Sequence, residues 1–235
     1  MLHNNIFILI FLITFSISGQ YDIETKVFYH IYNQNFIEAQ KLLNEKSQYM
    51  KPFAKSWLEC DLQWWKAVHT DTDSAYQKLQ LFLEKKINIE ENKVPQDEHM
   101  IMLYKNYLMR FSAMQNQRFK VLKYFYQIES FNHKLDIDSL NEFEKDIFQI
   151  FNSVLYISKS KLWIFSDKNN AEYLRILEKY TTSDNLMLQT LSKYFLIKIY
   201  TEILETPAKA IHYQEDLMRI YPNNVNFKTL LNTEG

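Results

Sequence analysis

Glycine is scarce in this sequence. Its 235 residues include two glycines, Gly19 and Gly235, where an average protein of this length carries about sixteen. Glycine supplies the positive φ of tight hairpin turns and lets a backbone approach a bound phosphate closely. The scarcity therefore excludes Rossmann turns, P-loops and the nucleophile elbow of α/β-hydrolases.

Cysteine and the common catalytic motifs are equally sparse. The single cysteine, Cys60, cannot form an internal disulfide or a cysteine zinc cluster, and we interpret it as a buried residue on a helix. There is no His-Glu-x-x-His, no repeated Glu-x-x-His and no glycine-flanked serine. Asp97, Glu98 and His99 lie at a predicted helix start, where acids favour the helix dipole without a metal. We therefore predict no catalytic, metal-binding or cofactor-binding residue; a catalytic site assembled from distant helices stays open.

Neither sign of charge dominates. The chain has 27 basic and 28 acidic residues, which argues against a nucleic-acid partner, because such proteins present a basic face. The stretch 118–126 interleaves basic and aromatic residues. At helical spacing, Phe119, Leu122, Phe125 and Tyr126 are predicted to form a core stripe, with the lysines in solvent.

One long apolar run is present, at residues 6–17. As a helix its twelve residues extend about 18 Å, short of the roughly 30 Å of a bilayer core. Ser18 and Gly19 follow it, and a charged stretch begins at Asp22. This layout predicts a signal peptide at 1–19, export to the periplasm, the cell envelope or the medium, and no stable membrane span after cleavage. A buried N-terminal helix and an uncleaved anchor are the alternatives.

The rest of the sequence has helical periodicity and predicts an all-α fold. The clearest apolar stripe begins near Asp138, where Ser139 and Glu142 have the spacing of a capping box. Thr206 and Pro207 have the pattern of another helix start. The prolines fall where the periodicity breaks, at positions 52, 95, 207 and 222.

These breaks divide the chain into helical hairpins. We predict five, at 22–47, 52–87, 97–132, 138–181 and 184–221, with a short terminal helix near 225–232. The stretch 20–235 is interpreted as a single domain with a possible joint at 88–96. Because glycine is missing, we expect asparagine and aspartate to adopt the left-handed conformations that these turns need.

Two stretches resemble the tetratricopeptide repeat (TPR) family. In 210–224, the family's small residue, aromatic residue, late apolar pair and helix-ending proline correspond to Ala210, Tyr213, Leu217, Ile220 and Pro222. Residues 33–43 are similar, with Phe36 and Ala39 in the aromatic and small positions. The chain departs from the pattern at Lys198, where the family has a small residue, and at Glu205, where its turn often has glycine.

The resemblance implies a divergent TPR-like α-solenoid, a right-handed stack of about five antiparallel hairpins. It also implies a non-enzymatic interaction or scaffold module that binds a protein or peptide on its concave face. An irregular helical bundle is the alternative fold. The alternative functions are a helical small-ligand binder or enzyme with a site in the inner curve, and a stand-alone relative of a receptor sensory domain.

Three tryptophans on one predicted helix are the candidates for partner binding. Trp57 and Trp64 share a face, and Trp65 is turned about 100° from its neighbour. Exposed aromatic side chains on a concave surface are typical anchors for a partner. Packing between adjacent hairpins is the other interpretation, because every repeat of a solenoid requires it.

Overall fold

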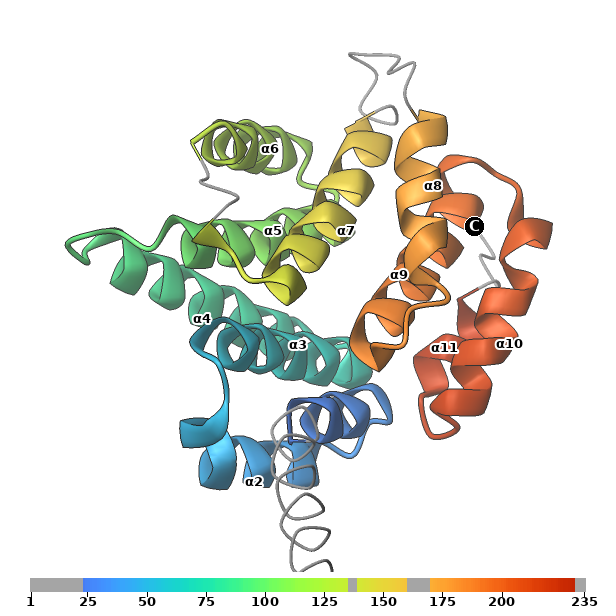
Figure 1. Ribbon diagram of the computed structural model, residues 1–235, viewed down its shortest axis with the longest axis horizontal. Helices are drawn as coiled ribbons and strands as arrows, with labels where there is room; N and C mark the ends of the chain where they lie inside the picture. The colour runs from blue at the N-terminus through green and yellow to red at the C-terminus, as the bar shows by residue number, and fades with distance from the viewer. Residues whose placement is uncertain (1–22, 135–138, 160–169, 231–235) are drawn as a thin grey trace, which may run out of the picture.

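The computed structural model describes residues 23–134, 139–159 and 170–230 (Figure 1). The predicted signal peptide at 1–19 and both glycines lie outside these ranges. Within them every regular element is a helix and no strand is present. The all-α prediction is therefore confirmed for the described part of the chain.

The helices follow one another through short turns. A first helix covers residues 23–32. It is followed by α2 (Phe36–Lys46), a 3₁₀ turn (Ser47–Tyr49), α3 (Pro52–Thr70), α4 (Asp73–Glu91), α5 (Glu98–Met114), α6 (Arg118–Asn132), α7 (Glu142–Lys159), α8 (Asn170–Tyr180), α9 (Leu186–Lys198), a π-helical turn (Ile199–Ile203), a second 3₁₀ turn (Pro207–Ala210), α10 (Ile211–Ile220) and α11 (Val225–Thr229). Each predicted hairpin corresponds to two successive helices of this series.

Some helix ends differ from the predicted ones. α4 continues to Glu91, into the predicted joint at 88–96. α7 begins at Glu142, and its capping box lies two residues beyond the predicted pair. The Asn141 N–H donates to Glu144 Oε2 at 3.2 Å, and the Glu144 N–H donates to Asn141 Oδ1 at 3.1 Å. Asparagine caps as well as serine does, so the sequence offered two overlapping boxes.

Four turns contain a residue with positive φ that is not glycine. Gln34 (61°), Asp71 (48°), Asn116 (54°) and Glu205 (52°) each lie between the two helices of one predicted hairpin. Asn116 and Asp71 match the expected use of asparagine and aspartate. Gln34 and Glu205 do not, and for such side chains the left-handed region costs about 1–2 kcal/mol.

Replacing Glu205 with glycine is expected to stabilise the protein. Glycine adopts positive φ without the steric cost, and this gain exceeds its greater entropy in the unfolded chain. We expect the free energy of unfolding to rise by about 0.5–1 kcal/mol, or roughly 1–4 °C in Tm for a chain of this size. Thermal denaturation measures the change. Glu205→Ala is the control, and an equal gain for alanine would contradict the backbone explanation.

Hydrogen bonds join the first hairpin to the chain at the start of α11, between residues 190 to 192 positions apart in the sequence. The Asn223 N–H donates to Asn33 Oδ1 at 3.1 Å. Asn224 Nδ2 donates to the Tyr32 carbonyl at 2.7 Å, and its Oδ1 accepts from Gln34 Nε2 at 3.1 Å. The same Oδ1 caps α11 by accepting from the N–H groups of Asn226 and Phe227. The first and last described hairpins are thus held together, and the series of helices closes on itself.

Asn224→Ala is expected to destabilise the protein by about 2 kcal/mol. The substitution removes a helix cap and leaves the Tyr32 carbonyl without its donor, and each loss costs about 1 kcal/mol or more. Urea denaturation measures the effect. Asn224→Asp keeps an oxygen for the cap and loses the amide donor, so it separates the two contributions. A change below about 0.5 kcal/mol for alanine would mean that the closure adds little stability.

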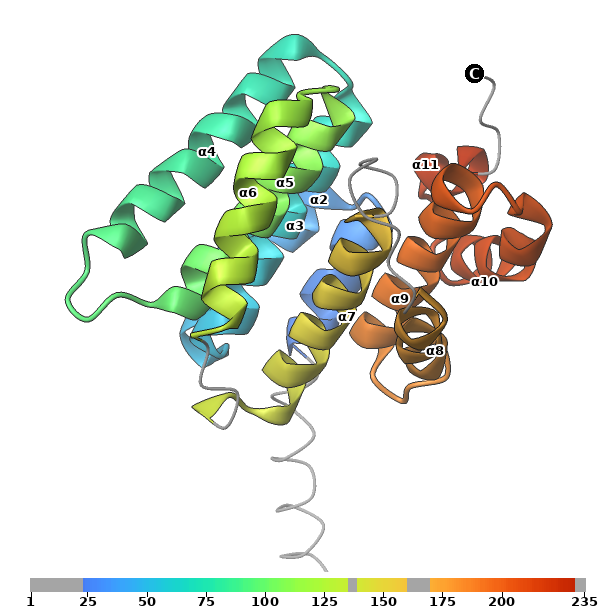
Figure 2. The same ribbon diagram turned by 90° about the horizontal axis from the view of Figure 1, so that it is seen from above.

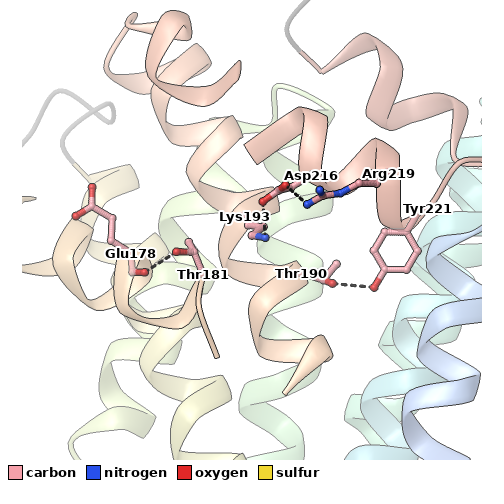
Figure 3. A network of polar contacts seen from close by, with 7 residues as sticks. All are labelled: Glu178, Thr181, Thr190, Lys193, Asp216, Arg219 and Tyr221. Atoms are coloured by element: carbon pink, nitrogen blue, oxygen red, sulfur yellow. Dashed lines mark hydrogen bonds and ion pairs between the residues drawn. The ribbon is translucent and has the colours of Figure 1, made fainter. Parts of the chain in front are cut away.

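A polar network fixes α10 on α9 (Figure 3). The buried Lys193 on α9 donates to Asp216 on α10 at 2.8 Å, and Arg219 contacts the same carboxylate at 2.6 Å. The hydrogen bond from Lys193 lowers the pKa of Asp216. The hydroxyls of Thr190 and Tyr221 are 2.7 Å apart. These contacts hold α9 in place, and α9 is one wall of the groove described below.

One continuous hydrophobic cluster fills the interior, and it includes residues from Val27 to Leu230. Cys60 is buried within it, as expected. Ala39 and Ala210, the small residues of the two TPR-like stretches, have no exposed surface. Among the described helices, none has the length and apolar character that crossing a membrane requires.

Candidate binding groove

The helices leave a gap in their packing between α6 and α7. Successive α-helices pack closely from α2 to α6 and again from α7 to α11. Among the successive helices from α2 to α11, α6 and α7 are the pair whose backbones do not pack closely. Their side chains still meet at one end of the gap, where Asn132 donates to Asn152 and Lys159 lies near Glu129. Figure 2 shows α4, α5 and α6 together on one side, with α7 to α11 on the other. The helix α3 connects the two groups, because it packs on α4 and α5 and its aromatic rings contact Phe143 and Phe148 of α7.

A groove of about 970 Å³ occupies this gap, and we call it the central groove. Its volume lies at the upper end of the roughly 300–1,000 Å³ typical of ligand sites. It is lined by Trp64 and Val68 of α3, Met109, Arg110, Ala113 and Met114 of α5, Asn116 and Gln117 of the following turn, Arg118, Val121, Leu122 and Phe125 of α6, Val154, Leu155 and Ser158 of α7, Tyr194, Phe195 and Lys198 of α9, and Ile199, Glu202 and Ile203 of the π-helical turn.

The burial of the side chains on α6 differs from the predicted core stripe. Phe125 is buried, but Phe119 is 90% exposed and Tyr126 is 53% exposed, so the predicted four-residue core stripe is wrong. The buried positions are Val121, Phe125 and Ile128. α6 packs closely on α5, whereas its contacts with α7 are made by side chains, among them Glu129 and Asn132. A helix packed closely on one side buries a narrower stripe than one packed on two.

Arg110 lies at the groove among aromatic rings. Its Cζ is 4.4 Å from the ring centre of Trp64, 5.1 Å from Phe195, 5.2 Å from Tyr107 and 6.0 Å from Tyr194. Such cation–π contacts hold a guanidinium in place and use none of its N–H donors. Within the described residues, Arg110 donates no hydrogen bond and forms no ion pair.

A buried carboxylate lies behind this arginine. Asp61 on α3 is 1% exposed, and its Oδ2 accepts from the Tyr32 hydroxyl at 3.1 Å while Oδ1 accepts from Tyr107. Burial raises the pKa of Asp61 to about 6, although the bond from Tyr107, the charge of Arg110 and the bond from Tyr32 act to lower it. Burial, and then the charge of Asp61, raise the pKa of both tyrosines, so both remain donors.

The groove carries an excess of positive charge. Its charged lining residues are Arg110, Arg118, Lys198 and Glu202, and Lys198 is paired with Glu202 at 2.6 Å. The two arginines are therefore not neutralised by the acid of the lining. No histidine lines the groove. This arrangement suits the binding of an apolar ligand that carries negative charge.

The three tryptophans singled out from the sequence occupy different places. Trp57 is fully buried between Phe28 and Phe143. Trp65 is 2% exposed and packs among rings of the first helix, α9 and α11. Trp64 is 5% exposed and lines the central groove. Of the three, only Trp64 meets the groove.

Sequence reasoning missed Arg110 and Asp61. Both lie within long helices where single charged residues are ordinary, and the groove walls come from five separate α-helices. The sequence feature that could best have indicated Asp61 is its position within the stretch 57–68, which is rich in apolar residues.

Asp97, which the sequence placed at a helix start, caps α5 by accepting from the Met100 N–H at 3.1 Å. No cluster of metal-ligating side chains occurs in the described ranges.

The chain was compared with known proteins at three levels. No family model, no curated protein and no solved structure matches it. Function is therefore inferred from the geometry of the central groove and from the TPR-like stretches of the sequence.

Proposed function

We propose that this chain is a non-enzymatic interaction module that binds a segment of a protein or peptide in the central groove. The supporting observation is the groove itself, about 970 Å³ in volume. Two thirds of its lining side chains are apolar, and Trp64 and Arg110 lie among them. Tryptophan and arginine are the residue types most enriched among the side chains that dominate binding energies.

Binding is better supported than catalysis. Glu202 is the acid that lines the groove, and it is paired with Lys198. Asp61, whose pKa is raised to about 6, lies behind the rings and is already bonded to two tyrosines. General acid–base catalysis requires a titratable group within hydrogen-bond reach of the substrate, and the lining does not supply such a pair.

Two further parts of the proposal come from the sequence. The TPR-like stretches support a divergent TPR-like repeat, with its successive helical hairpins. The apolar run at 6–17 supports export, so that the partner would be met in the cell envelope or outside the cell. Together they describe an exported scaffold protein without a cofactor.

Site-specific photo-crosslinking tests the proposed function. A benzoylphenylalanine is placed at Leu122, which lines the groove, and as a control at Leu81, which lies on α4 and is 66% exposed. Irradiation in a cell-envelope extract is expected to yield a protease-sensitive adduct at position 122 and none at 81. Adducts of low mass at position 122 would favour the small-ligand alternative. Equal yields at both positions, or no adduct, would contradict a binding role for the groove.

A further inference from the structure

The central groove lies where the series of packed helices is interrupted. α5 is covered by α4 and α6, and α8 is covered by α7 and α9. Between these groups, α6 and α7 face a space lined by Leu122 and Val154. The C-terminal half of α6 is joined directly to α7, because Asn132 donates to Asn152 at 2.9 Å and Lys159 lies 3.8 Å from Glu129. A helix placed in the groove would therefore lie against the N-terminal half of α6 and the C-terminal half of α7, whose side chains line it.

The chemistry of the walls favours a helix over an extended segment. A strand or loop would bring unpaired N–H and C=O groups against mostly apolar side chains, at a cost of roughly 1–3 kcal/mol for each buried group. Seven of the 21 lining side chains are polar or charged, and they are spread over α5, α6, α7, α9 and two turns, so they do not form the regular row of partners that an extended backbone needs. A helix satisfies its own backbone and presents only side chains, as in other helix-in-groove complexes.

Arg110 is suited to a ligand that carries negative charge. Its guanidinium is held by four rings and, within the described ranges, donates no hydrogen bond. The buried Asp61 balances part of its charge but accepts its hydrogen bonds from two tyrosines, so the N–H groups of Arg110 remain unused. A carboxylate pairs with a guanidinium in a bidentate manner.

We propose that the central groove receives an amphipathic helix of a partner protein, whose apolar face fills it and whose glutamate or aspartate side chain pairs with Arg110. This inference rests on the proposed function and specifies its ligand. The walls bind the apolar face, and Arg110 selects helices with an acid at one position of that face. Arg118 adds to the positive potential at the groove.

Selection from two displayed libraries tests the inference. One presents a stable helical scaffold with a randomised face, and the other presents unstructured linear peptides of equal length. Both are selected against the full chain, and binders are kept when the benzoylphenylalanine at Leu122 crosslinks to them. We expect the helical library to be enriched, with an acidic residue fixed at one apolar-face position.

Affinity measurements on the selected helix isolate the role of Arg110. Arg110→Met is expected to weaken binding at least 30-fold, since loss of a desolvated charged partner costs upwards of about 2 kcal/mol. Changing the acid of the helix to its amide is expected to weaken binding by a similar factor. Combining the two changes is expected to weaken binding little more than either change alone. Arg175→Met is the matched control, since Arg175 lies exposed on α8 outside the groove lining, and it is expected to leave affinity unchanged.

Whether the Arg110→Met variant still folds is tested separately, because Arg110 lies near the buried Asp61. Circular dichroism and a thermal transition establish that Arg110→Met is folded. The double variant Asp61→Asn, Arg110→Met removes both charges and is measured alongside it. Weakened binding in both folded variants supports the inference.

The remaining outcomes separate this inference from the proposed function. Helices enriched without an acid, or bound equally by Arg110→Met, would overturn the pairing with Arg110 while the groove still binds peptides. Enrichment of the linear library alone would overturn the helix and leave the proposed function standing. If neither library yields a binder that crosslinks at Leu122, both proposals fail.

Discussion

Trp65→Ala is expected to lower the free energy of unfolding by about 4 kcal/mol, within the range of roughly 3–5 kcal/mol for truncating a buried aromatic residue. Trp65 lies on α3 and is 2% exposed. Its ring centre is 5.2 Å from that of Tyr32, 5.6 Å from Tyr194 and 5.5 Å from Phe227. The substitution therefore opens a cavity where four separate segments of the chain meet.

Urea denaturation measures this loss, and Phe119→Ala is its control. Phe119 is also an aromatic residue on a helix but is 90% exposed, so its truncation is expected to change stability by less than about 0.5 kcal/mol. Trp65→Phe keeps much of the apolar contact and is expected to fall between the two. A loss below about 2 kcal/mol for Trp65→Ala would mean that the surrounding rings collapse into the space.

The second large effect is a dependence of stability on pH caused by Asp61. Its pKa in the folded protein is about 6, above the roughly 3.9 of an unfolded chain. Between these values the folded state binds a proton that the unfolded state does not. Stability therefore decreases as pH rises from about 4 to about 6, and this contribution is constant above that range. Two pKa units correspond to up to about 3 kcal/mol.

Comparison with Asp61→Asn isolates this contribution. Asparagine retains an oxygen that accepts from Tyr32 or Tyr107 and does not titrate. Unfolding free energies of both proteins are measured at several pH values from 4 to 8. The wild type minus variant difference is expected to fall as pH rises to about 6 and then to stay level. A difference that is independent of pH, or that rises, would contradict the raised pKa.

The sequence was most informative about features that depend on neighbouring residues. Periodicity and the prolines marked the helices, and Ala39 and Ala210 were placed at buried positions by a local pattern. The capping box of α7 was predicted two residues early because Ser139 and Asn141 both have an acid three residues on. Such shifts are expected where two local signals compete.

Features that depend on distant residues could not be predicted. Phe119 looked like a core residue because it shares a helical face with Leu122, but in the fold it is 90% exposed and does not line the central groove. Arg110 gains its role from rings on α3, α5 and α9. Asn224 and Tyr32 meet across almost the whole chain. The periodicity of a single helix does not indicate which distant residues that helix will contact.

The bonds between Asn224 and the first hairpin also limit how this fold can grow. An open repeat array can be lengthened by stacking another hairpin on its first or last unit, because each end surface is free. Here the turn at Asn33 and Gln34 is already bonded to residues 223–225. An added hairpin could stack there only if these hydrogen bonds were broken. Duplication of a hairpin is therefore tolerated least between these two segments, and added residues are better accommodated in the interhelical turns.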